Sequence, residues 1–229
     1  MRLAVPGRRA ASGLSPAHAL AYPLRRGSGG AWLVGLPLLL LFPLTFVLVF
    51  GYALQATRAS VADSASPPPR PHLDGRLLRD GALTFALVAA LTLPFVVLVW
   101  IGGGAMSNVL HPTRDAFFNR IYGLLAACLL IAIPWGLLLL LLLPANVAAY
   151  CASGRLRDLL DPVLAFRRVS ERFLDWNLAT VAMVTGWLLG FAALGLLCVG
   201  FLPGAFYAIL VSAHATASLA PRTASPSPG

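Results

Sequence analysis

The sequence predicts an all-α fold: a multi-pass bundle with about four full transmembrane helices, one proline-bent or re-entrant N-terminal segment and one amphipathic interfacial helix. Composition is the first observation behind this prediction. Of 229 residues, 59% are hydrophobic and 11% are charged, with a mean hydropathy of +0.81, whereas a soluble domain has about 25% charged residues. The other two observations are long apolar runs between short polar segments and a one-sided distribution of arginine.

Four apolar runs are long enough to cross a membrane, because a helical span needs about 20 apolar residues. These runs are 31–57, 82–110, 121–149 and 178–220. They indicate a single transmembrane domain over 31–220, preceded by a basic cytoplasmic tail (1–30) and followed by a short disordered tail (221–229). The fourth run is too long for one helix, so we expect two spans joined near Pro203, where Gly and Pro favour a turn.

Prolines interrupt these runs. Proline within a helix removes a backbone hydrogen bond and kinks or breaks the element. The first run is only long enough for one tilted span, yet it contains two prolines. We expect helix breaks or turns at Pro37, Pro43, Pro94, Pro134, Pro144 and Pro203.

The distribution of arginine decides between two paths for the first run. All 17 basic residues are arginines, and cytoplasmic loops carry the excess of positive charge. If run 31–57 is one span, most arginines lie outside the cell. If it bends back at its prolines, fifteen of them share the cytoplasmic side. We therefore predict a shallow re-entrant segment in the plasma (inner) membrane, with the N-terminus in the cytoplasm, and keep a true span as the alternative.

The net charge of +9 favours contact with anionic lipid headgroups. No basic stretch alternates with aromatic residues as nucleic-acid binding would need. The three cysteines are isolated, and no His, Cys, Asp or Glu spacing is typical of a metal site. We expect no cofactor and no enzymatic activity. The apolar runs contain no Asp, Glu or Arg, which disfavours an ion-coupled transporter.

Segment 161–177, "DPVLAFRRVSERFLDWN", has the clearest amphipathic pattern. Asp161 can cap a helix whose first residue is Pro162. Apolar residues recur every three or four positions and share one face: Val163, Phe166, Val169, Phe173 and Trp176. Charged residues occupy the other face: Arg167, Arg168, Glu171, Arg172 and Asp175. We expect a helix lying flat at the headgroups, either as a plain anchor or as a docking surface for a protein partner.

Small residues predict close helix packing in the fourth run. Gly186, Gly190 and Gly195 could form a packing face within the chain or in a homo-oligomer. His214 is expected to be an interfacial or helix-contact residue.

Several stretches resemble the prokaryotic membrane-protein family called domain of unknown function 4013. They are "FGYALQATR", "LLRDGALTFALVAALTLP", "LLPANVAAYCASGRLRD" and "FYAILVSAHA". The resemblance covers roughly residues 20–218, and its most specific positions are Gly51, Tyr52, Arg58, Asp80 and Gly81. The first polar loop departs from the family by lacking a tryptophan. The resemblance implies fold and membrane location but no activity.

These observations favour a non-enzymatic scaffold or accessory membrane component that acts through its cytoplasmic face. A small transporter or permease-like component, with proline-broken helices lining the path, is the alternative. The sequence leaves open which molecule would be bound.

Overall fold

The computed structural model describes residues 15–41, 45–110, 116–195 and 200–221, and the regular secondary structure in these ranges is helical. The elements are α1 (Pro16–Ala21), η1 (Tyr22–Leu24), α2 (Gly29–Leu40), α3 (Phe46–Ala62), α4 (Gly75–Leu110), α5 (Ala116–Ser153), α6 (Leu156–Leu160), α7 (Pro162–Glu171), α8 (Phe173–Ala192), η2 (Ala193–Gly195) and α9 (Phe201–Ala217). The all-α prediction is confirmed for the described part of the chain.

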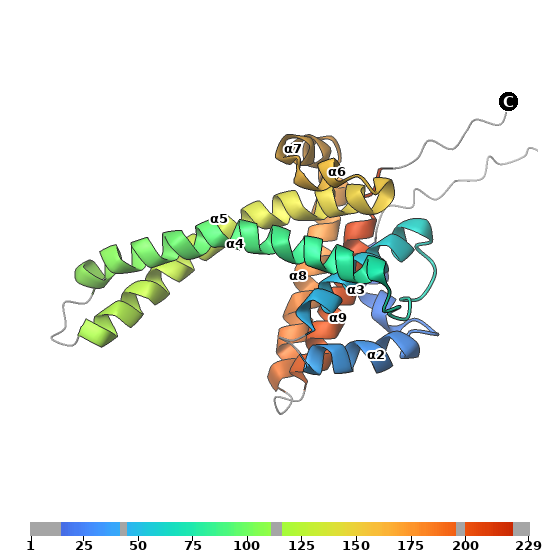
Figure 1. The fold of residues 1–229 in the computed structure, drawn as a ribbon, viewed down its shortest axis with the longest axis horizontal. Helices are drawn as coiled ribbons and strands as arrows, with labels where there is room; N and C mark the ends of the chain where they lie inside the picture. Colours follow the sequence, from blue (N-terminus) through green and yellow to red (C-terminus); the bar gives the residue numbers. More distant parts are fainter. Residues whose placement is uncertain (1–14, 42–44, 111–115, 196–199, 222–229) are drawn as a thin grey trace, which may run out of the picture.

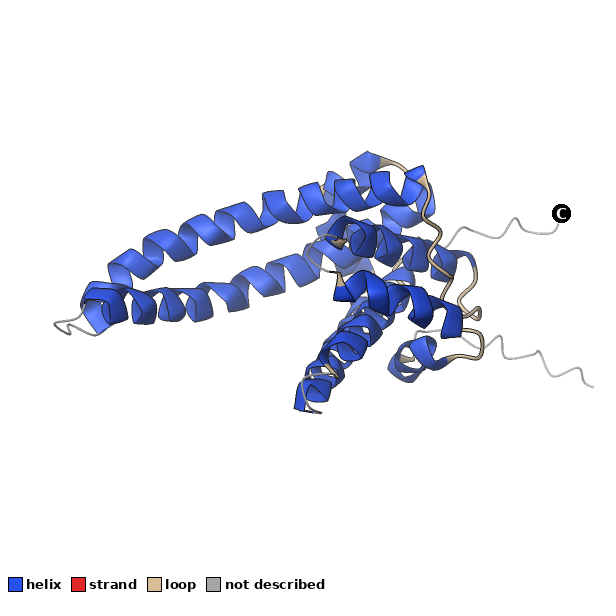
Figure 2. Cartoon of the chain, turned by 60° about the horizontal axis from the view of Figure 1, so that its bottom comes forward, coloured by secondary structure: helices blue, strands red, loops and turns tan. Residues whose placement is uncertain are grey.

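Helices α4 and α5 form a long antiparallel hairpin that projects away from the other helices (Figure 1; Figure 2). Their 36 and 38 residues correspond to roughly 54 and 57 Å at 1.5 Å per residue. Both are long and apolar enough to cross a membrane, and their most apolar windows are 0% and 6% buried. The core helix of a soluble protein would instead be mostly buried, whereas the apolar side chains of these helices are largely uncovered by the rest of the described chain.

The first apolar run forms two helices rather than one. Helix α2 ends at Leu40 and α3 begins at Phe46; the predicted break at Pro43 lies outside the described residues. With 12 and 17 residues, each helix is shorter than the roughly 30 Å hydrocarbon core requires. The two helices contact each other, and both contact α9.

The fourth run also forms two helices, α8 and α9, which pack against each other in a direction different from that of the hairpin (Figure 1). A Cβ added at Gly186 would press on Val211, and one at Gly190 would clash with the backbone of Gly204. Both glycines therefore serve packing within the chain, whereas Gly195 has no such neighbour. Within the described ranges, α4 and α5 are the helices that meet the length and composition of a full span, so the prediction that α8 and α9 also span stays a prediction.

Four of the predicted helix breaks are wrong. Pro37 lies inside α2, Pro94 inside α4, and Pro134 and Pro144 inside α5. Each proline removes one backbone hydrogen-bond donor from its helix. If the helix broke there, the neighbouring backbone groups would lose their partners as well. That loss is larger where no water can replace the lost hydrogen bonds, so the helix continues through the proline. Pro203 occupies the first turn of α9, where amide groups lack intrahelical partners in any case, so the helix begins two residues before it and residues 196–199 of the connection lie outside the described residues.

The N-terminal tail is shorter than predicted. Residues 16–24 form α1 and η1, in which Ala19 and Tyr22 are buried. Tyr207 donates a hydrogen bond to the Leu20 carbonyl (2.9 Å) and Trp32 donates one to the Pro23 carbonyl (2.8 Å). These contacts attach the segment to α9 and α2, so the packed domain begins before residue 31.

The core of the molecule surrounds α9. Phe206, Leu210 and Val211 are almost fully buried between the α2–α3 pair and α8. His214 is also buried: its ring stacks on Tyr22 at 4.4 Å between centroids, and Nδ1 lies 3.2 Å from the Ser60 hydroxyl. It is a helix-contact residue, one of the two roles predicted.

Candidate functional site

Helices α3 and α4 cross at very close range, and two glycines allow it. A Cβ on Gly51 would clash with the Leu77 carbonyl, and one on Gly81 would clash with the Val47 carbonyl. Any side chain at either position would push the two backbones apart. The crossing thus brings the C-terminal half of α3 against the first turns of α4.

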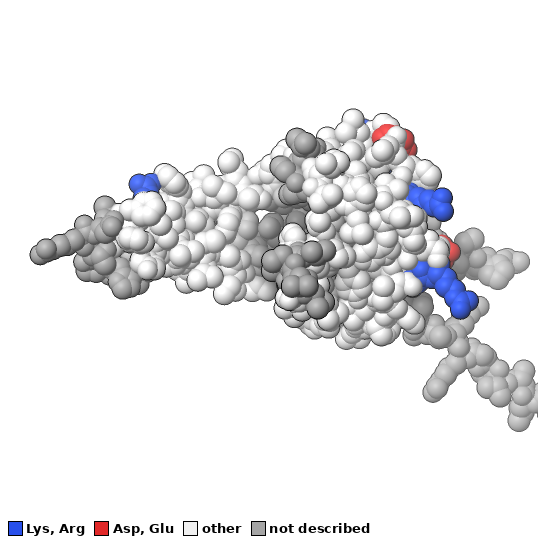
Figure 3. Space-filling view, turned by 90° about the horizontal axis from the view of Figure 1, so that it is seen from below, with Lys and Arg blue, Asp and Glu red and all other residues white. Residues whose placement is uncertain are grey.

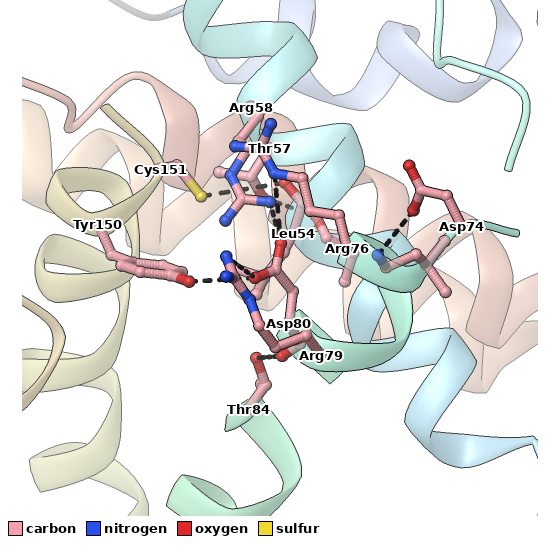
Figure 4. A network of polar contacts seen from close by, with 12 residues as sticks. Leu54, Thr57, Arg58, Asp74, Arg76, Arg79, Asp80, Thr84, Tyr150 and Cys151 are labelled. Atoms are coloured by element: carbon pink, nitrogen blue, oxygen red, sulfur yellow. Dashed lines mark hydrogen bonds and ion pairs between the residues drawn. The ribbon is translucent and has the colours of Figure 1, made fainter. Parts of the chain in front are cut away.

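A buried ion pair lies beside this crossing. The Arg58 guanidinium of α3 pairs with the Asp80 carboxylate of α4, whose side chain is 1% exposed. The Tyr150 hydroxyl of α5 donates to Asp80 Oδ1 (3.1 Å), and the Tyr150 ring lies 5.3 Å from the Arg58 guanidinium carbon. Three helices therefore meet at one carboxylate (Figure 4).

Two further arginines converge on the same carboxylate. Arg76 Nε lies 3.9 Å from Asp80 Oδ2, and Arg79 Nη2 lies 3.7 Å from Oδ1. Their side chains are 64% and 70% exposed, so they face the outside of the network. Figure 4 shows all three arginine side chains around Asp80. The single negative charge of Asp80 is thus surrounded by the positive charges of three arginines.

The polar loop between α3 and α4 is held by hydrogen bonds from α3 and from the N-terminal segment. The Tyr52 hydroxyl donates to the Pro69 carbonyl (3.0 Å), and Arg25 Nη1 donates to the Ser64 carbonyl (2.6 Å). Asp74 caps α4, its Oδ1 accepting from the Leu77 amide at 2.8 Å. The loop that lacks the family's tryptophan is therefore still ordered by specific contacts.

The predicted amphipathic helix is only partly correct. Asp161 does cap α7, accepting from the Leu164 amide at 3.0 Å. The helix ends at Glu171, because Arg172 adopts a non-helical backbone (φ −130°, ψ 41°), and Phe173 and Trp176 belong to α8.

The apolar residues predicted for one face of α7 differ in exposure. Val163 and Phe166 are exposed, at 77% and 63%, whereas Val169 is buried together with Ala165. Part of the predicted apolar face is therefore covered by the protein, and part is left open.

Most of the arginines near α7 bind the protein itself. Arg168 pairs with Asp158 (3.1 Å), and Arg172 pairs with Asp175 (2.6 Å) while donating to the Ala220 carbonyl (3.0 Å). Arg167 is exposed and pairs with Glu171. The hydrogen bond from Ser153 and the Arg168 guanidinium lower the pKa of Asp158 below its ordinary value. Arg168 and Arg172 thus have partners within the protein, and contact of this segment with anionic headgroups stays a prediction.

The polar segments lie together at one end of the molecule, which we call the polar end (residues 22–30, 58–80, 150–172 and 218–221). The contacts from Arg25 to the α3–α4 loop, from Arg58 and Tyr150 to Asp80, and from Arg172 to the C-terminal segment join them. Figure 3 shows charged side chains at this end of the face in view, then a broad uncharged surface, and a basic group near the other end of the hairpin. The structure thus separates charge from apolar surface along its long axis.

Residues 35–202 match the family model described as "Protein of unknown function (DUF4013)". The chain belongs to this family. The match covers a slightly narrower range than the resemblance seen in the sequence. No curated protein and no solved structure matches the chain.

The five family-like positions lie in one place in this DUF4013 chain. Gly51 and Gly81 form the crossing, Arg58 and Asp80 form the ion pair, and Tyr52 holds the loop. Sequence reasoning singled them out separately but did not pair them, and it missed three partners: Arg76, Arg79 and Tyr150. The available signal was Asp80 itself, an acidic residue in an arginine-rich stretch directly before an apolar run.

Proposed function

We propose that the protein is a non-enzymatic integral membrane protein of the plasma (inner) membrane that acts as a scaffold or accessory component through its polar end. The polar end lies in the cytoplasm together with the N-terminus. The α4–α5 hairpin crosses the bilayer, and the α2–α3 pair enters it from the cytoplasmic side and returns. The proposal goes beyond the family assignment, which carries no activity.

The exposed apolar surface of the hairpin supports the membrane location. Leu129 and Ile133 of α5 and Leu93 and Ile101 of α4 are each more than 60% exposed. Exposed apolar patches of this extent are typical of lipid or protein contact. Val163 and Phe166 continue this surface, since they line a shallow apolar groove with Leu138 and Leu141 of α5. Lipid chains would cover the groove as they cover the hairpin.

The observation that carries the scaffold proposal is the gathering of arginine-rich segments from distant parts of the chain at the polar end. Both ends of the α2–α3 pair, both ends of the α8–α9 pair and the base of the hairpin adjoin these segments. Under the positive-inside rule, such an end lies in the cytoplasm. It offers a charged, ordered surface of loops and short helices on which a cytoplasmic or membrane protein could dock.

The sidedness is tested by thiol labelling in a background in which Cys128, Cys151 and Cys198 are replaced. Ala65→Cys, in the exposed α3–α4 loop, should react with a membrane-impermeant reagent only after cells are opened. Phe117→Cys, at the start of α5 and 68% exposed, is the matched control and should react in intact cells. Labelling of Ala65→Cys from outside would overturn the proposed topology.

The scaffold role is tested by site-specific photo-crosslinking in cells. A crosslinker at Arg157 and one at Leu160, both exposed in α6, should capture the same discrete protein. A crosslinker at Leu129 on the hairpin should not capture it. Absence of a common adduct from both α6 positions would contradict a protein-docking role.

A transporter or permease-like role is the second candidate, and a cavity favours it. A space of about 610 Å³ lies among α2, α3, α5, α8 and α9 and is lined mostly by apolar side chains such as Leu39, Phe50, Val147 and Leu202. Its lining suits a hydrophobic molecule better than an ion. Ala205→Trp would fill the cavity, and a loss of uptake of a hydrophobic dye into liposomes, with folding unchanged, would favour this candidate over the scaffold.

A further inference from the structure

We propose that the arginine groove beside Asp80 binds a phosphate group, of the kind carried by an anionic phospholipid headgroup or by free phosphate. This site is independent of the scaffold proposal, because it requires no protein partner. The groove has a volume of about 230 Å³ and is lined by Gly51, Gln55, Arg58, Asp74, Arg76 and Asp80. It lies beside the α3–α4 crossing, since Gly51 is one of its lining residues.

The first argument is the surplus of positive charge. Arg58, Arg76 and Arg79 surround one buried carboxylate, which neutralises only one of them. The groove itself is lined by two arginines, Arg58 and Arg76, and two carboxylates, Asp74 and Asp80. Arg79, which lies beside Asp80 but does not line the groove, brings the cluster to one net positive charge. An anion would complete the neutralisation without rearrangement of the helices.

The second argument is that each oxygen of Asp80 already accepts a hydrogen bond from a closer partner than Arg76 or Arg79. Arg58 pairs with Oδ2, and Tyr150 donates to Oδ1. Arg76 and Arg79 stand 3.9 and 3.7 Å from these oxygens, farther than a normal hydrogen bond. Their guanidinium donors, and the Gln55 side chain at the groove, are available to a further acceptor.

The third argument comes from inside the network. Arg58 Nε is buried and has no hydrogen-bond partner among the described residues. A buried unsatisfied donor on a charged group is costly. An oxygen of a bound anion, or a water molecule held by it, would satisfy this donor.

Guanidinium geometry selects phosphate among anions. Arginine presents a planar set of donors that matches phosphate and carboxylate oxygens in pairs, and a phosphate group offers oxygens in several directions to side chains from two helices. The depth of the site is also suitable. Arg76 and Arg79 precede the apolar run that begins at residue 82 by six and three positions, roughly 9 and 5 Å along the helix, the level at which headgroups lie beside a span.

The test uses the full-length protein in detergent and two probes: a short-chain, water-soluble phosphatidylglycerol and inorganic phosphate. Wild-type protein should bind at least one of them saturably. The double variant Arg76→Gln/Arg79→Gln should weaken that binding by about tenfold or more, the loss of roughly 1.4 kcal/mol. Asp74→Asn should strengthen it, because it removes the opposing charge and retains a capping side chain.

Arg120→Gln is the matched control. It removes one arginine charge near the other end of the hairpin, where the Arg120 guanidinium lies 4.6 Å from the Trp100 ring centroid, and should leave binding unchanged. Binding of the lipid alone identifies a headgroup site, whereas phosphate that binds and displaces the lipid identifies a general phosphate site. Binding of neither probe, or equal binding by the double variant and wild type when both melt at the same temperature, would overturn the proposal.

Discussion

The two ends of the α4–α5 hairpin are built from the same two helices but have opposite surroundings. At the base, Asp80 and Tyr150 are buried against α3 and share a polar network. Farther out, Leu129 and Ile133 are largely exposed, and Arg120 lies over the Trp100 ring. The base is stabilised by protein contacts and the outer part requires an apolar solvent. One hairpin therefore joins a buried polar network at its base to an arm whose apolar side chains are exposed.

Asp80→Asn, at the base of the hairpin, should have the largest effect on stability. The substitution leaves Arg58, Arg76 and Arg79 close together without their shared carboxylate. Breaking a buried pair costs about 3–5 kcal/mol, so the melting temperature in detergent should fall steeply or the protein should fail to accumulate. The double variant Arg58→Met/Asp80→Leu should recover much of this loss, since an apolar pair removes the uncompensated charge. A wild-type melting temperature for Asp80→Asn would show that the network does not stabilise the base.

Leu129→Asp tests the outer part of the hairpin. Leu129 is 70% exposed, so the change would cost little in water but about 2.5–3.5 kcal/mol within a bilayer. We expect reduced membrane insertion, measured as the fraction of a fluorescent fusion that remains in washed membranes. Leu78→Asp is the control, because Leu78 is 55% exposed at the base near Arg76 and Arg79. Equal insertion of both variants would contradict a lipid-facing arm.

Gly81→Ala tests whether the close α3–α4 crossing, rather than helix propensity, decides the effect of a glycine substitution on stability. The added methyl group would press on the Val47 carbonyl, and overpacking costs about 1–3 kcal/mol. Gly104→Ala lies in the same helix with no atom near the new Cβ, so it should be neutral or stabilise by up to about 1 kcal/mol through helix propensity. Thermal unfolding in detergent should shift the two variants in opposite directions. A shift in the same direction would mean that the crossing tolerates a side chain.

Asp158→Asn should have the smallest effect, at the surface of the polar end. Its pair with Arg168 is partly exposed, so we expect a loss of about 0.2–1 kcal/mol at pH 7. The pKa of Asp158 is lowered in the folded protein, so its contribution is present above about pH 3.9, the unfolded value. It is lost as the pH falls through the lower folded value. The difference in melting temperature between Asp158→Asn and wild type should therefore shrink at acid pH, and a constant difference would exclude this charge effect.

Sequence reasoning succeeded where one local signal decided the structure. The runs that became α4 and α5 are long enough to be recognised by composition, and Asp161 with Pro162 correctly marked the start of α7. It failed at Pro94 and Pro134, because a helix in an apolar medium loses more by unwinding than by losing one hydrogen bond. It also failed to end α7 at Glu171, since the partners of Arg172 include the Ala220 carbonyl, far along the chain.

The sequence by itself determined the helical class, the two long apolar helices and the family, because these depend on the hydrophobicity and order of residues that are neighbours along the chain. It also placed Gly51, Arg58, Asp80 and Gly81 among the distinctive positions. Only the tertiary structure decided that these residues meet, and that Tyr150 joins Asp80 from 70 residues away. The reason is physical: the Gly51–Gly81 crossing excludes side chains between two backbones, and that approach brings Arg58 to Asp80.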